Sequence, residues 1–233
     1  MLPAPRVVDE ESYARYFTPR RIDDRSSDAE RQAIGYLGLF LPVLLVSVAA
    51  WRATDAAPGW PPLDSISEYY HSGAVAILTG VLAILALFLA TYRGFRGGVL
   101  DVRAGRIAAF AALGVSVFPT AAIEPLTAPA WWMDWMDYVH FGCATALFGS
   151  FAFYSLVLFP KGDASKADKR RRNHVYRVCG AGILGAMLWA LIAHEMGGHI
   201  FWPETLALEL FGISWLTKGR ALHTLRQVLG PGP

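Results

Sequence analysis

Hydrophobic residues along this chain form six long blocks, separated by polar segments. Each block has the length, about 17–25 residues, that a helix needs to cross the roughly 30 Å hydrocarbon core of a bilayer. The blocks predict transmembrane helices at about 33–51, 73–92, 105–123, 136–159, 176–195 and 200–217. We therefore expect an all-α integral membrane bundle over residues 33–217, with polar tails at 1–32 and 218–233.

Polar and helix-breaking residues interrupt some of these blocks. Pro119 lies inside the third, where it removes one backbone hydrogen bond, so we expect a kink there. Glu209 lies near the middle of the sixth, where an ionised carboxylate costs about 2.5 kcal/mol or more unless it is paired or faces water. Gly197 and Gly198 separate the last two blocks, which predicts a tight turn and an antiparallel helical hairpin.

Lysine and arginine are concentrated in alternate gaps between the blocks. The two tails, the gap between the second and third blocks and the gap between the fourth and fifth hold 20 of the 21 cations, counting residues at the block edges. The exception is Arg52. Because cytoplasmic loops of membrane proteins carry the excess of Lys and Arg, both termini are predicted to be cytoplasmic. The expected location is the cell inner (plasma) membrane, with multiple passes and with 52–72, 124–135 and 196–199 outside.

Composition agrees with a membrane class and argues against other classes. The chain is 54% hydrophobic and 17% charged, whereas soluble domains carry about 25% charge. The net charge is +2, and no basic stripe with interleaved aromatics suggests a nucleic-acid partner. Residues 1–32 lack the pattern of a cleavable signal peptide, so we expect the first block to be an uncleaved anchor. Cys143 and Cys179 fall toward opposite leaflets, which predicts two free thiols.

Side chains able to do chemistry collect at the outer ends of the blocks. Asp137 and His140 are spaced i, i+3, so they share a helix face on which a carboxylate can orient an imidazole. The seven candidates for an outward-facing polar cavity are Ser65, Ser67, Glu68, His71, Asp137, His140 and Glu204. A structural role is open as well, because Asp64 could cap the helix start while Ser67 and Glu68 bind nearby amides.

Three functions fit this pattern. The first is a protein without a cofactor that binds a membrane lipid or lipid-like group in the outward cavity, or serves as a subunit for a membrane protein partner. The second is a metal-assisted hydrolase or transferase acting on lipids at the outer leaflet, with Glu68 or Asp137 as general base. Its zinc ligands would be His71, His140 and one of His194 or His199. The third is a transporter with Glu209 as a proton-linked carboxylate, against which the lack of an inverted repeat argues.

The spacing of the last two histidines bears on the zinc alternative. His194 and His199 are i, i+5, which places them about 140° apart on a continuous helix. They could bind one metal only if the Gly197–Gly198 turn folds back. The zinc-peptidase helix instead needs i, i+4 with an intervening Glu.

Three stretches carry a resemblance to known proteins. They are the segment 63–71 (LDSISEYYH), His140-Phe141 with the small and aromatic run 144–153, and Phe201-Trp202-Pro203-Glu204 with the run 211–219 (FGISWLTKG). Together they resemble an uncharacterised group of bacterial six-helix membrane proteins. That group is more distantly similar to the eukaryotic superfamily of damage-regulated autophagy modulators and glycosylphosphatidylinositol-anchor remodelling factors.

The resemblance implies six spans with both ends inside, and work on lipids or lipid-anchored proteins. It marks Ser65, Ser67, His140 and Glu204 as positions shared with the superfamily pattern. The alkaline-ceramidase-like membrane hydrolases are a second comparison, because Ser67 and His71 are similar to their first motif. That family pairs its last histidines at i, i+4 and has seven spans, so this chain departs from it in both respects.

Overall fold

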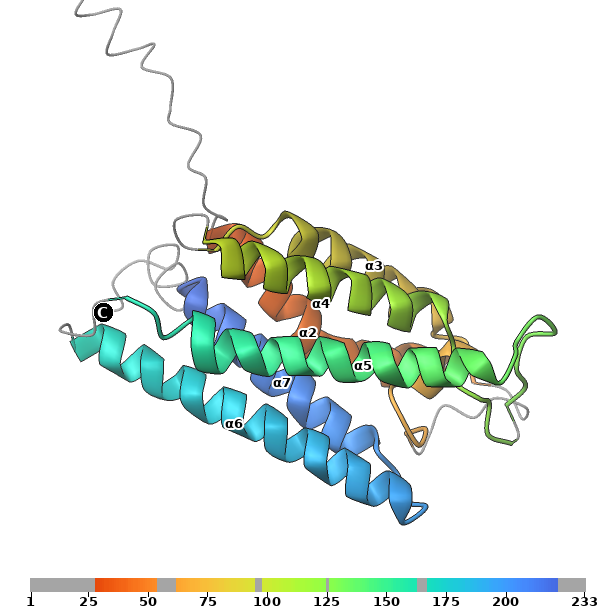
Figure 1. Ribbon diagram of the computed structural model, residues 1–233. Helices are drawn as coiled ribbons and strands as arrows, with labels where there is room; N and C mark the ends of the chain where they lie inside the picture. The colour runs from red at the N-terminus through yellow and green to blue at the C-terminus, as the bar shows by residue number, and fades with distance from the viewer. Residues whose placement is uncertain (1–27, 54–61, 95–97, 125, 163–166, 222–233) are drawn as a thin grey trace, which may run out of the picture.

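The computed structural model describes residues 28–53, 62–94, 98–124, 126–162 and 167–221. Those residues form six α-helices, a 3₁₀ turn and a π-helical turn, with no strand. The elements are α2 (Asp28–Trp51), η1 (Ser67–His71), α3 (Val75–Thr91), α4 (Val99–Val117), α5 (Trp135–Phe153), η2 (Tyr154–Leu158), α6 (Ala167–Glu195) and α7 (Phe201–Lys218). Figure 1 shows the helices lying side by side in one elongated bundle. The all-α prediction is therefore confirmed.

Helix length and surface composition both favour a membrane. Three segments, Asp28–Trp51, Trp135–Leu158 and Ala167–Glu195, are long and apolar enough to cross one. Large apolar side chains also point away from the bundle: Phe110 is 75% exposed and Leu87 is 64% exposed. Soluble monomers rarely expose apolar surface on this scale, whereas a lipid-facing surface requires it.

The third helix lies elsewhere than the sequence predicts. α4 starts at Val99 and ends at Val117, so it covers neither the end of the predicted span 105–123 nor Pro119. Phe118 has an extended backbone (φ −102°, ψ 104°), the conformation favoured before a proline. Pro119 therefore terminates the helix, and the predicted kink is wrong.

Two other helices begin earlier than predicted. α2 starts at Asp28 instead of residue 33, and α6 starts at Ala167 instead of residue 176. The first turns of α6 are polar and carry an i, i+4 ion pair of 3.1 Å between Asp168 and Arg172. A helix can thus continue past the apolar block on which the prediction was based. The predicted tails 1–32 and 218–233 fall mostly outside the described residues.

Glycines allow α2 and α7 to approach closely. A Cβ added at Gly212 would lie 2.8 Å from the backbone oxygen of Gly35, and one added at Gly35 would lie 3.0 Å from that of Gly212. Such backbone proximity is typical of membrane helices, where van der Waals contact replaces the hydrophobic effect as the main attraction. α7 also packs on α6 through the predicted hairpin, in which Gly197 takes a positive φ of 68°.

Aromatic and basic side chains close one end of the bundle. Trp215 is fully buried, with ring centroids 4.8 Å from Tyr92 and 5.1 Å from Phe159. The Phe159 carbonyl follows the π-helical turn and accepts from the ammonium groups of Lys169 at 2.9 Å and Lys218 at 3.4 Å. Cations are favourable there because carbonyls at a helix end lack internal donors. The candidate site lies at the opposite end of the bundle.

Candidate functional site

The segment before α3 is fixed to the start of α7. The Asp64 carbonyl accepts hydrogen bonds from the backbone N–H groups of Ile200 at 2.7 Å and Phe201 at 2.8 Å. Two residues along, the Ile66 N–H donates to Glu204 Oε2 at 2.7 Å. First-turn amides of a helix have no internal acceptor, so this segment caps α7 from outside.

Ser65 and Glu68 bind backbone amides at the start of η1. The Glu68 N–H donates to Ser65 Oγ at 3.1 Å, and Glu68 Oε2 accepts from the Asp64 N–H at 2.7 Å. This reciprocal arrangement is close to a capping box. Glu68 is 4% exposed and its Oε1 has no partner among the described residues, so burial raises the pKa of its carboxyl. Glu68 therefore binds a nearby amide as the structural interpretation expected, whereas Ser67 bonds to His140 and the Asp64 carboxylate contacts His199 instead of capping η1.

Ser67 and His140 form a hydrogen-bonded pair that links η1 to α5. Ser67 Oγ and His140 Nε2 are 2.8 Å apart, and His140 Nδ1 lies 2.6 Å from the Phe118 carbonyl oxygen. A carbonyl can only accept, so Nδ1 carries the proton and Nε2 of the neutral ring is an acceptor. Ser67 therefore donates its hydroxyl proton to Nε2. The two side chains are 7% and 2% exposed, respectively.

His71 and Asp137 bind the same short segment, Phe118–Ala121, after α4. His71 Nε2–H donates to the Thr120 carbonyl at 2.9 Å, and Asp137 Oδ1 accepts from the Ala121 N–H at 3.1 Å. The other ring nitrogen of His71 is buried without a partner among the described residues, and burial lowers the pKa of this imidazole. Asp137 therefore does not orient His140, as its spacing on the helix suggested. The two ring nitrogens of His140 bond to Ser67 and to the Phe118 carbonyl, and Asp137 binds the backbone of the same segment.

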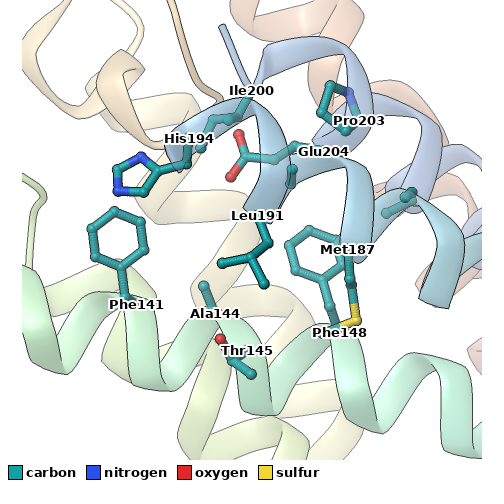
Figure 2. Close-up of a pocket in the computed structure, with 13 residues that line it drawn as sticks. Phe141, Ala144, Thr145, Phe148, Met187, Leu191, His194, Ile200, Pro203 and Glu204 are labelled. Atoms are coloured by element: carbon teal, nitrogen blue, oxygen red, sulfur yellow. The ribbon is translucent and has the colours of Figure 1, made fainter. Parts of the chain in front are cut away.

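A surface cavity of about 150 Å³ lies between α5, α6 and α7. Of the seven side chains predicted to line a polar cavity, Glu204 lines this one. Figure 2 shows Glu204 and His194 toward one end of the cavity, and Phe148 and Met187 toward the other. The lining residues are Phe141, Ala144, Thr145, Phe148, Ala186, Met187, Ala190, Leu191, His194, Ile200, Pro203, Glu204 and Ala207.

The cavity is mostly apolar, and the sequence prediction did not include its walls. Four of its lining residues are alanines, which leave room between helices that larger side chains would fill. Ala186 and Ala190 are spaced i, i+4 on α6, so they share a helix face. This i, i+4 spacing of small residues can be read from the sequence and indicates a face of α6 with room beside it. It did not indicate which neighbouring helix would leave the space open.

The histidines of the zinc alternative do not converge. His71 and His140 have the separate partners described above, while His199 Nδ1 contacts the Asp64 carboxylate. His194 instead faces the cavity, in ring contact with Phe141 at 5.4 Å. Across the described part of the chain, no group of three or more His, Cys, Asp or Glu could hold a metal ion. The residues present therefore do not fit the predicted zinc site.

Glu209, the residue of the transporter alternative, is half-buried in the middle of α7. It does not line the cavity. Among the residues that the structure describes, no hydrogen bond or ion pair joins Glu209 to the hydrogen-bonded groups at the end of the bundle. The geometry thus adds no support for a proton path through this residue.

Comparisons with known proteins add no assignment. No protein-family model matches the chain, and no curated protein or solved structure matches it. The resemblance to six-helix bacterial membrane proteins therefore stays an expectation drawn from short motifs.

Proposed function

We propose that this chain is a multi-pass membrane protein that holds the acyl chain of a membrane lipid between α5, α6 and α7. The observation that carries this function is the apolar cavity of about 150 Å³, with Glu204 and His194 toward one end (Figure 2). An engineered protein cavity of about 150 Å³ accommodates benzene, so the space suits about six carbon atoms. One section of an acyl chain has that size.

In the proposed topology all six helices cross the membrane, with both chain ends cytoplasmic. The one-sided distribution of Lys and Arg supports this orientation. α3, α4 and α7 have 17, 19 and 18 residues, which at about 1.5 Å each gives roughly 26–29 Å, close to the hydrocarbon thickness. The end with Glu204 and His194 then faces the outer leaflet of the plasma (inner) membrane.

Polar contacts must supply most of the selectivity for a lipid. Lipid tails are about as apolar as the cavity walls, so moving an acyl chain from the bilayer into the cavity gains little hydrophobic free energy. Glu204 is held in place by the Ile66 N–H at 2.7 Å and can accept a further hydrogen bond. We therefore favour a lipid with a hydroxyl or amide N–H beside its acyl chain.

Lipid retention by a cavity-filling variant tests this function. Ala190→Phe places a ring in the cavity, whereas Ala83→Phe places the same ring at an exposed position on α3. After purification in mild detergent, mass spectrometry should find about one lipid per chain in wild type and Ala83→Phe. Ala190→Phe should retain at least tenfold less.

Two results would overturn the proposed function. One is a folded wild-type protein that carries no lipid. The other is an Ala190→Phe protein that keeps its lipid at the wild-type level, because the cavity would then not be where the lipid binds.

A further inference from the structure

The hydrogen bonds around His140 leave Ser67 in the state that nucleophilic catalysis requires. Because the Phe118 carbonyl fixes the Nδ1–H tautomer, the Nε2 lone pair faces the Ser67 hydroxyl at 2.8 Å. Serine hydrolases use the same relation between a serine, a base and a group that orients the base. Here a backbone carbonyl takes the place of the orienting carboxylate.

Neighbouring residues connect the pair to the polar end of the cavity, although neither Ser67 nor His140 lines the cavity itself. Ser67 follows Ile66, whose N–H is bonded to the cavity-lining Glu204. His140 precedes Phe141, whose ring also lines the cavity. Two separate connections therefore join the serine–histidine pair to the end of the cavity that Glu204 and His194 mark. An acyl chain in the cavity with its headgroup at this end would bring its ester linkage toward Ser67.

We propose that Ser67 is a catalytic nucleophile and His140 its general base, in a metal-free acyl transfer from lipid esters. This activity depends on the proposed lipid binding and names its substrate class. Ser67 Oγ forms a bond to the ester carbonyl carbon as its proton moves to His140 Nε2. The imidazolium then gives that proton to the departing alkoxide, which leaves as an alcohol.

The acyl group is then bound as an ester of Ser67, and a second acceptor completes the reaction. A lipid alcohol attacks the acyl carbon, gives its proton to Nε2 and releases Ser67 Oγ, which takes that proton back. Water in the same position gives hydrolysis. The two side chains are 7% and 2% exposed, and exclusion of bulk water favours transfer to an alcohol over hydrolysis.

A long-chain alkyl fluorophosphonate is the probe for this activity. An activated serine displaces its fluoride and keeps the phosphonyl group, which peptide mapping by mass spectrometry locates. Wild-type protein in mild detergent should carry the adduct on Ser67, and Ser67→Ala should carry none. Ser155 is the internal control, because it is also buried but is bonded to Ser214 at 2.8 Å instead of an imidazole, so it should stay unmodified.

His140→Asn separates catalysis from structure. The shorter amide can still donate to the Phe118 carbonyl but offers no base to Ser67. Loss of a general base should slow labelling by at least about 100-fold. A variant with the wild-type melting temperature shows that the fold is intact.

The outcomes distinguish this activity from lipid binding itself. A folded wild-type protein that retains lipid but shows no Ser67 adduct overturns the catalytic role and leaves the binding function standing. Equal labelling of wild type and His140→Asn overturns the role of His140 as base. A Ser67 adduct in protein that carries no lipid, with labelling unaffected by Ala190→Phe, overturns the binding function instead.

Discussion

Replacing Gly212 with alanine tests how closely α2 and α7 pack. An added Cβ would lie 2.8 Å from the Gly35 backbone oxygen and 3.0 Å from the Leu39 backbone nitrogen. Ordinary van der Waals contact begins at 3.4 Å, so the first distance falls short by 0.6 Å. Because both neighbours are backbone atoms, they cannot rotate away, and the two helices must move apart.

Two opposing terms set the size of the effect. Overpacking of a well-packed interface costs about 1–3 kcal/mol, and a backbone contact belongs in the upper part of that range. Alanine gains about 1 kcal/mol over glycine in a helix interior. We therefore expect Gly212→Ala to lower the free energy of unfolding by about 1–2 kcal/mol, close to a tenfold change in the equilibrium constant.

Gly149→Ala on α5 is the matched control. Its added Cβ meets no heavy atom within 4 Å, so only the propensity gain remains, and stability should be unchanged or up to about 1 kcal/mol higher. Both variants are unfolded from mild detergent micelles with increasing sodium dodecyl sulfate and followed by circular dichroism. If Gly212→Ala proves as stable as Gly149→Ala, the close crossing of α2 and α7 is refuted.

Two further predictions concern topology and pH. With Cys143 and Cys179 replaced, an impermeant maleimide should label Met196→Cys in intact cells and Lys161→Cys only after permeabilisation; the reverse pattern would invert the proposed orientation. Burial lowers the pKa of His71, so the stability it contributes is complete above its ordinary value of 6.5 and is lost as pH falls toward the lower folded-state value. His71→Asn should flatten the decline in unfolding free energy between about pH 7 and 5, and an unaltered slope would count against the buried neutral imidazole.

Helix content and the position of the candidate groups could be read from the sequence because both follow local rules. Apolar blocks of membrane-spanning length predict helices wherever they occur. The glycine pair before α7 predicts a hairpin because Gly197 readily takes a positive φ. Ser67, His140 and Glu204 were all placed at one end of the bundle, and the structure links them by hydrogen bonds through η1 and the residue before it.

The hydrogen-bond partners of the histidines could not be predicted from the sequence, because they are backbone atoms. His140 binds the carbonyl of Phe118, and His71 binds that of Thr120. Every residue carries a carbonyl, so nothing in the sequence marks which one stays free for a distant imidazole. Both carbonyls belong to the segment after α4. The sequence predicts that this helix continues to residue 123, past Pro119, whereas it ends at Val117. An error in one helix boundary therefore concealed the partners of two candidate residues.

The cavity could not be predicted from local sequence patterns either, because it forms only where three helices pack together. Ala144 and Ala207 are ordinary membrane-helix residues, and each becomes part of a wall only through its packing partners. The sequence predicted a polar cavity from titratable residues. In the structure most of those residues hydrogen-bond to one another or to the backbone, and the cavity beside Glu204 is lined mainly by apolar side chains.

Photo-crosslinking tests most directly whether a lipid acyl chain occupies this cavity. A lysophospholipid, which has a free hydroxyl beside its acyl ester, carries a diazirine in its acyl chain and is added to the purified protein. The sample is irradiated, and the adducts are mapped by mass spectrometry. We predict adducts concentrated on Met187 and Leu191, and their loss in Ala190→Phe. Adducts that are spread equally over exposed positions such as Leu87 and Phe110, and that Ala190→Phe leaves unchanged, would contradict binding of the acyl chain in this cavity.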